Sequence, residues 1–171
     1  MEKLLNKKSL IVLLIANFLF LSGCGYHFIK YNTEKKVFIS PFENYSLQPQ
    51  IEIYTISKLY EMILNYPGFI PVKNKENADI IIKGKIKKVK RPPIFFSTEN
   101  ANEIVMAKFS VEVETEIYKG KKIVSKNLIK EILPVELLNG FKEEEMLERL
   151  GTQIARRLFF ILVKKYEEDI I

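Results

Sequence analysis

Residues 108–118 alternate between two kinds of side chain, and no other feature of the sequence constrains the fold as strongly. One side of this segment would carry Phe109, Val111, Val113, Thr115 and Ile117, and the other side Lys108, Ser110, Glu112, Glu114 and Glu116. A period of two is that of a β-strand with one buried face and one face in water. The segment therefore predicts a sheet that is covered on one side only.

The rest of the chain supplies further strands and two helices. Apolar runs bounded by turn residues predict strands over 37–42, 69–72, 79–90 and 123–133, with turns at 43–46 and 119–122. Helical spacing predicts one helix over 49–65, with an apolar stripe of Ile53, Ile56, Tyr60, Ile63 and Leu64. A second helix follows Asn139, its candidate cap, with a stripe of Leu147, Leu150, Ile154, Leu158, Ile161 and Leu162.

This order of elements predicts the fold class. We expect an α+β two-layer sandwich in which two helices pack on one face of a four- or five-stranded mixed, mostly antiparallel sheet. The first strand–helix–strand link should be a right-handed parallel crossover. A length of 171 residues suits one domain, and we expect residues 37–171 to form it.

The N-terminus has the composition of an export signal. Lys3, Lys7 and Lys8 precede an uncharged, mainly apolar run over residues 9–21. A helix of this length would span about 20 Å, which is short of the roughly 30 Å hydrocarbon core of a bilayer. The pattern is typical of a secretory signal peptide. An uncleaved anchor helix is the alternative.

The sequence Leu21-Ser22-Gly23-Cys24 at the end of this run resembles the bacterial lipobox. That resemblance implies cleavage before Cys24 and lipidation of its thiol, and the alternative is a chance cysteine. Gly25 follows where an Asp favours inner-membrane retention in many Gram-negative bacteria. We therefore expect a signal peptide over 1–23, a lipidated tether over 24–36, and anchoring in the outer membrane at its periplasmic face.

Composition excludes several classes of function. One cysteine and one histidine cannot build a disulfide, a multi-thiolate zinc site, an iron–sulfur cluster or a multi-histidine metal site. The single histidine, His27, lies three residues from the expected lipid anchor, and no hydrolase, P-loop or dinucleotide motif is present. We expect no enzyme activity and no cofactor.

The basic excess of the chain is concentrated in nine residues. Removing residues 1–23 takes away three lysines and one glutamate, so the net charge falls from +6 to +4. Without the cations of segment 83–91 the remaining chain would carry −2. These cations are Lys83, Lys85, Lys87, Lys88, Lys90 and Arg91. Convergent cations on a rigid strand suit the phosphates of a lipid A head group, whereas the export signal disfavours nucleic acid.

Two interpretations of this basic segment remain open. Lys83, Lys85 and Lys87 share a face by alternation, and cross-strand pairs with Glu112, Glu114 and Glu116 would occupy them if the two strands run antiparallel. Lys88, Lys90 and Arg91 lie at the end of the strand, beyond the evident acidic partners. They are the stronger candidates for an anion site.

The loop that follows, residues 91–103, carries three large apolar side chains. Ile94, Phe95 and Phe96 come directly after Pro92-Pro93. They either cover the open end of the core or project into a partner or into acyl chains. If they are exposed, apolar contacts would lie beside the cations, as a lipopolysaccharide site requires.

Several segments together resemble the LPS-assembly lipoproteins (LptE-like). They are Cys24-Gly25-Tyr26-His27-Phe28, the run 37–44 with its helix, the strand 78–86 and the closing amphipathic helix. The resemblance implies a non-enzymatic partner of the LptD-like outer-membrane barrel, which plugs the barrel, assists its assembly and binds lipopolysaccharide during insertion into the outer leaflet. The run 37–44 with its helix and strand also occurs in envelope lipoproteins that activate a peptidoglycan synthase or serve a secretion complex, and this scaffold function is the alternative.

Overall fold

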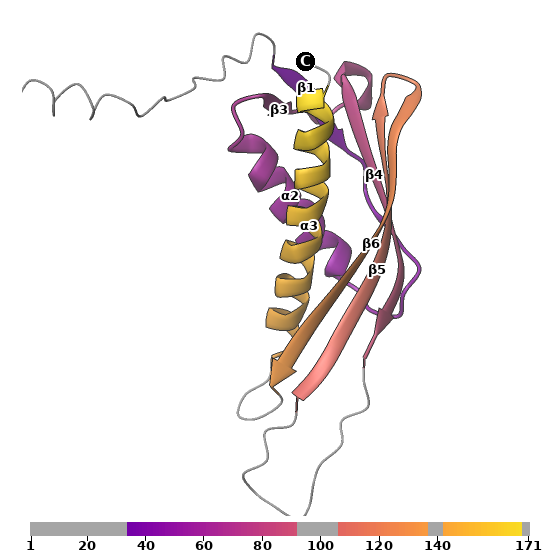
Figure 1. Ribbon diagram of the computed structural model, residues 1–171, viewed down its shortest axis with the longest axis vertical. Coiled ribbons are helices and arrows are strands. Elements are labelled where there is room, and N and C mark those ends of the chain that lie inside the picture. The colour runs from indigo at the N-terminus through magenta and orange to yellow at the C-terminus, as the bar shows by residue number, and fades with distance from the viewer. Residues whose placement is uncertain (1–33, 92–105, 137–141, 169–171) are drawn as a thin grey trace, which may run out of the picture. The chain divides into compact units, whose positions relative to one another are not determined.

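Two helices lie on one face of a twisted sheet in the computed structural model (Figure 1). The structure describes residues 34–91, 106–136 and 142–168, which belong to the unit Asn32–Ile171. The predictions for the signal peptide, Cys24, the apolar side chains at 94–96, the cap at Asn139 and most of the tether lie outside the described residues. The tether prediction is wrong at its end, because Lys35 and Lys36 already belong to the first strand, Lys35–Ile39. The α+β prediction, with both helices on one face of a mixed sheet, is confirmed.

The sheet has six strands in the described residues, in the order β3-β1-β4-β5-β6, and β2 also pairs with β4. The strands are β1 (Lys35–Ile39), β2 (Glu43–Asn44), β3 (Phe69–Pro71), β4 (Ile80–Lys90), β5 (Met106–Lys119) and β6 (Lys122–Glu136). β1 runs parallel to both β3 and β4, as expected for the first crossover, and β2 is also parallel to β4. The two long ladders, β4–β5 and β5–β6, are antiparallel.

The predictions for residues 37–46 were partly wrong. The first strand ends at Ile39, and Glu43–Asn44 forms strand β2 instead of a turn. The amide of Ser40 still donates to Ile82, and that of Tyr45 donates to Ile86, on either side of Pro41. Pairing with β4 is therefore interrupted after Ser40 and resumes at β2, beyond Pro41 and Phe42.

The alternation in β5 is confirmed side chain by side chain. Phe109, Val111, Val113, Thr115 and Ile117 are all buried, while the intervening residues are partly or fully exposed. In β4 the continuous run Ile80, Ile81 and Ile82 is buried, because this strand lies between β1 and β5 in the centre of the sheet.

The helices are α2 (Ile51–Leu64) and α3 (Glu143–Glu168), and a short 3-10 turn, η1, spans Lys75–Asn77. The stripe expected for α3 is confirmed, with Leu147, Leu150, Ile154, Leu158 and Leu162 buried and Ile161 half-buried. The stripe expected for α2 is confirmed only at Ile63, and Ile56 is half-buried. The buried residues of α2 are Ile51, Thr55, Leu59 and Ile63, spaced four apart, whereas Ile53, Tyr60 and Leu64 are exposed.

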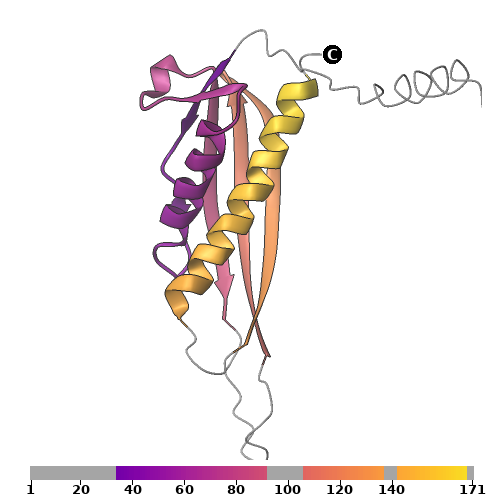
Figure 2. The same cartoon turned by 90° about the vertical axis from the view of Figure 1, so that its left-hand side faces the viewer.

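α2 and α3 touch closely at Gly151, in front of the same face of the sheet (Figure 2). A Cβ atom at position 151 would lie 2.7 Å from the Tyr54 Cβ and 3.0 Å from the Thr55 amide nitrogen. Only glycine leaves room for this approach. The same contact buries Thr55 of α2. Its hydroxyl donates a hydrogen bond to the Ile51 carbonyl, so the buried polar atom has a partner.

A second close contact involves Gly84 in the middle of β4. A Cβ atom there would lie 2.3 Å from the Phe42 ring. Phe42 belongs to the segment that joins β1 to β2, and its side chain is buried. The missing side chain at Gly84 therefore makes the site in which Phe42 packs.

We predict that Gly84→Ala destabilises the fold by about 1–3 kcal/mol, the usual cost of overpacking, measured by urea unfolding. In a Phe42→Ala background the same substitution should be neutral or stabilising, because the ring is gone and alanine loses less conformational entropy than glycine. An equal cost in both backgrounds would show that the ring is not the cause.

Candidate functional site

The solvent side of the sheet, opposite the helices, gathers most of the predicted site residues. We call this surface the lysine face. Among its charged residues are Lys83, Lys85, Lys87, Lys88, Lys90, Lys108, Lys126 and Lys130, with Glu43, Glu112, Glu114 and Glu116. Lysines therefore outnumber glutamates in this set.

A β-bulge at Lys87 decides which lysines reach water. Lys83 lies opposite Glu116 and Lys85 opposite Glu114, but the register then shifts, so that Lys88 lies opposite Glu112. Without the extra residue, strict alternation would place Lys88 and Lys90 on the buried face with Ile86. The bulge returns both lysines to the solvent face.

The expected Lys–Glu pairing is present only in part, because Lys87 alone of the three expected lysines forms an ion pair with a β5 glutamate in the described residues. The other ion pairs of these glutamates are made by lysines that the sequence analysis did not consider. On the β4 side, Lys87 Nζ lies 3.8 Å from Glu114, and Lys85 Nζ pairs with Glu43 of β2 at 3.4 Å. On the β6 side, Lys126 Nζ lies 3.1 Å from Glu114 and 3.2 Å from Glu116. Glu112 pairs with Lys130 of β6 at 3.2 Å. The β5 glutamates are therefore shared between two basic strands.

Two tyrosines complete the charged network. The Tyr118 hydroxyl donates to Glu116 at 2.6 Å, and its ring lies 4.7 Å from Lys83 Nζ. The Tyr45 hydroxyl donates to Glu43 at 2.5 Å, and its ring lies 5.7 Å from Lys87 Nζ. Each ring thus holds a lysine over its face, a favourable cation–π geometry.

These contacts shift the pKa values of the carboxylates and their partners. The hydrogen bond from Tyr118, helped by Lys126, lowers the pKa of Glu116 below its ordinary value of 4.5. The hydrogen bond from Tyr45, helped by Lys85, likewise lowers the pKa of Glu43. The hydrogen bond to Glu43 raises the pKa of Lys85. These three shifts all favour the charged forms of Glu116, Glu43 and Lys85.

Lys88 and Lys90 differ from the other lysines of β4. Both are exposed, and neither side chain forms an ion pair or hydrogen bond with another residue in the described ranges. The Glu112 carboxylate opposite Lys88 is held by Lys130 instead. Within β4, these two lysines are therefore available to an external anion.

Arg91 does not belong with them, and the expectation that it lies beyond acidic partners was wrong. Its guanidinium is ion-paired with Glu143 and donates a hydrogen bond to Gln48. The Gln48 amide also donates to Glu143 at 2.9 Å. The first turn of α3 brings this glutamate to the end of β4, a contact between residues 52 positions apart in the sequence.

A largely apolar side chain lies beside the cations, although it is not one of those predicted. Ile94, Phe95 and Phe96 are outside the described residues. Both interpretations of these side chains, that they cover the end of the core or that they project into a partner or acyl chains, therefore stay predictions. The residue seen is Tyr45, which is 64% exposed and has Lys87 Nζ over its ring. Leu47, two positions later in the sequence, is fully exposed. Residues 43–46 had been interpreted only as a turn, which is why Tyr45 was missed.

The opposite end of the lysine face is hollowed. A pocket of about 520 Å³ is lined by Lys75, Lys83 and Lys121, together with Tyr118 and Glu76. Among the described residues, no three histidine, cysteine, aspartate or glutamate side chains are placed to hold a metal ion. None of the helices within the described ranges has both the length and the apolar composition to cross a membrane.

Comparisons with known proteins identify the fold. No family model matches the chain, and no curated protein matches its sequence. A solved protein of the DUF330 family from Xanthomonas campestris is similar over 80% of this chain and 88% of its own, with a TM-score of 0.56 and 8% identity. A hypothetical protein from Chlamydia trachomatis covers 74% of this chain and 96% of its own, with a TM-score of 0.50 and 9% identity. At such identities the two similarities show a shared fold.

A lipoprotein is also among the similar solved structures. The uncharacterised lipoprotein B from Nitrosomonas europaea covers 74% of this chain and 80% of its own, with a TM-score of 0.48 and 16% identity.

We predict that Glu116→Gln makes the fold less sensitive to acid. Because the pKa of Glu116 is lower in the folded chain than in the unfolded chain, its carboxylate stabilises the fold above pH 4.5, and this contribution is lost as the pH falls below that value. Urea unfolding at pH 7 and pH 3.5 should show a loss of stability that is smaller in the variant by about 0.2–1 kcal/mol, the range for cross-strand pairs. The exposed Glu76, changed to Gln, is the control. Equal losses in wild type and Glu116→Gln would contradict the prediction.

Proposed function

We propose that this protein is a lipid-anchored envelope protein that binds lipopolysaccharide through the lysine face and acts with an LptD-like outer-membrane barrel. In this function it plugs the barrel, assists its assembly and holds lipopolysaccharide during insertion into the outer leaflet. Cys24 is the proposed lipid attachment point, and the periplasmic side of the outer membrane is the proposed location.

The observation that carries the proposal is the composition of one end of the lysine face. Lys88 and Lys90 are exposed on a rigid strand without ion pairs to described residues. The same solvent face carries Tyr45 next to Lys87. Cations that converge beside exposed apolar side chains match a lipid that joins phosphates to acyl chains.

The internal network supports this assignment because it separates two kinds of lysine. Lys85, Lys87, Lys126 and Lys130 each contact a glutamate of the same face, so their charge is largely compensated within the protein. Ligand phosphates would therefore add their favourable energy at the uncompensated positions, Lys88 and Lys90. Lys83 and Lys85 are assigned a supporting role, and Arg91 joins α3 to the sheet.

We predict that chemical crosslinking of the full chain in envelope membranes of its own host captures a large outer-membrane β-barrel protein. Mass spectrometry of the tagged, crosslinked chain identifies the partner. Depletion of the protein should then reduce both assembled barrel and surface lipopolysaccharide. Capture of a peptidoglycan synthase or a secretion component, with lipopolysaccharide export unchanged, would instead support the scaffold or activator function.

We predict that Lys88→Ala with Lys90→Ala weakens lipopolysaccharide binding by about tenfold or more, equivalent to about 1.4 kcal/mol, because two uncompensated cations are lost. The measurement is binding of labelled lipopolysaccharide to the full lipidated chain in detergent. Lys142→Ala with Arg149→Ala is the matched control, since it removes the same charge on the helix side of the molecule. Equal weakening in both double variants would indicate non-specific attraction and contradict the assignment of the site.

A further inference from the structure

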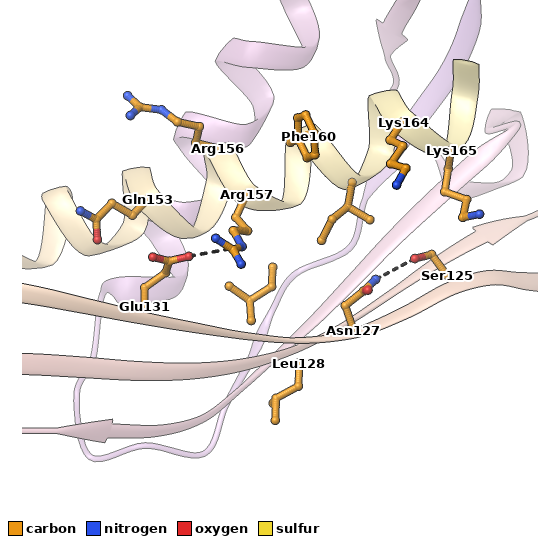
Figure 3. A pocket seen from close by; sticks show the side chains of 12 residues that line it. Ser125, Asn127, Leu128, Glu131, Gln153, Arg156, Arg157, Phe160, Lys164 and Lys165 are labelled. Atoms are coloured by element: carbon orange, nitrogen blue, oxygen red, sulfur yellow. Dashed lines mark hydrogen bonds and ion pairs between the residues drawn. The ribbon is translucent and has the colours of Figure 1, made fainter. Parts of the chain in front are cut away.

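A second surface feature lies away from the lysine face, in a groove between α3 and β6 (Figure 3). Its volume is about 910 Å³. Ser125, Asn127, Leu128, Ile129 and Glu131 line it from β6, and Gln153, Arg156, Arg157, Phe160, Ile161, Lys164 and Lys165 line it from α3. The proposed lipid-binding lysines take no part in this groove.

One wall of the groove is the edge of a long strand. β6 spans 15 residues, Lys122–Glu136, and within the described strands it pairs only with β5. Its other side therefore presents main-chain donors and acceptors that no described strand satisfies. Such an edge binds another extended chain by adding it to the sheet.

The other wall is strongly basic. Four cations of α3, Arg156, Arg157, Lys164 and Lys165, line the groove against one acid, Glu131. In Figure 3, Arg157 and Lys164 point from α3 toward the strands. The Arg157 Nε atom lies 3.8 Å from Glu131, too far for a hydrogen bond, and the side chain is 67% exposed. The Arg157 donors are thus available to a second carboxylate.

Unsatisfied polar atoms and exposed apolar side chains lie next to this basic wall. The Oε1 atoms of Glu131 and Gln153 are buried and accept no hydrogen bond from the described residues. On the opposite face of β6, Leu128 and Ile132 are 55% and 61% exposed. A strand added to β6 would therefore have Arg157 and Lys164 beside one of its faces. Beside its other face it would have Leu128 and Ile132, which alternate with Lys126 and Lys130 of the lysine face.

We infer that this groove binds an extended acidic segment of a partner protein as an additional strand on β6. Acidic side chains at alternate positions of that segment would meet Arg157 and Lys164. Aliphatic side chains at the intervening positions would pack beside Leu128 and Ile132. The interaction is independent of the lipid site and goes beyond the proposed function.

Other occupants fit the groove less well. In a second copy of the chain, antiparallel pairing of two β6 edges about Leu128 places Lys126 opposite Lys130, and pairing about Lys130 places this lysine opposite itself, so that like charges repel. Pairing about Ile129 avoids this repulsion but places Lys130 opposite Leu128 and Lys126 opposite Ile132, so it gives neither lysine an acidic partner, whereas an acidic segment would. An acyl chain would cover the polar edge of β6 and the buried oxygens of Glu131 and Gln153 without giving them hydrogen bonds, which costs free energy.

The test uses the full lipidated chain in detergent and a fluorescent synthetic peptide of alternating glutamate and valine, long enough to span Ser125–Glu131. Anisotropy should show saturable binding of this peptide and none of its lysine–valine counterpart. Two N-methylated peptides, each blocked at one alternate set of amides, then test for strand pairing. Only the set that faces β6 donates to it, so one methylated peptide should bind and the other should not.

A pair of matched double variants locates the site. Arg157→Gln with Lys164→Gln should weaken peptide binding by about tenfold, or about 1.4 kcal/mol. Lys142→Gln with Arg149→Gln removes the same charge from the start of α3 and the residue before it, outside the groove, and should leave binding within about twofold of wild type. Thermal unfolding of each variant verifies that the fold is retained.

Three results would overturn the inference. Equal binding of the two N-methylated peptides would show that no strand is added to β6. Equal weakening in the two double variants would show non-specific attraction. If the peptide does not bind while phosphatidylglycerol vesicles bind in a manner that depends on Arg157 and Lys164, the groove is a lipid site.

Discussion

The close packing of α2 against α3 at Gly151 is the constraint on which the rest of the structure depends. The 2.7 Å approach that a Cβ atom would make to Tyr54 leaves no room for any side chain there. Both helices can thus cover the same face of the sheet, where the apolar side chains of β4 and β5 are buried. The opposite face remains in water, and its side chains become available for interactions with other molecules.

On that exposed face, stability and the proposed function use different lysines. Lysines of β4 and β6 flank the glutamates of β5, and this arrangement compensates charge in the middle of the sheet. The bulge at Lys87 carries Lys88 and Lys90 to the same face at the end of β4, where they keep their charge for an external anion. The groove between α3 and β6 offers a separate surface with different chemistry: a strand edge beside a basic helix.

Much of this architecture was predictable because it depends on local periodicity. The alternation from Phe109 to Ile117 and the apolar stripe of α3 both match the buried residues, since a strand or helix with one apolar side can bury only that side. The charge pattern also offered antiparallel pairing of β4 with β5 as one interpretation, and the structure supplies the register that places Lys83 opposite Glu116 and Lys85 opposite Glu114. Predictions failed where an apolar residue could lie either in the core or on the surface. Ile53 and Tyr60 of α2 were expected in the core and are exposed.

The sequence by itself determined the identity of the elements, the wet face of β5 and the concentration of cations between Lys83 and Arg91. Only the tertiary structure decided which of these cations are available. Glu143 reaches Arg91, and Lys130 takes the carboxylate of Glu112. The physical reason is that an ion pair depends on distance in space, whereas composition and periodicity report only on neighbours along the chain.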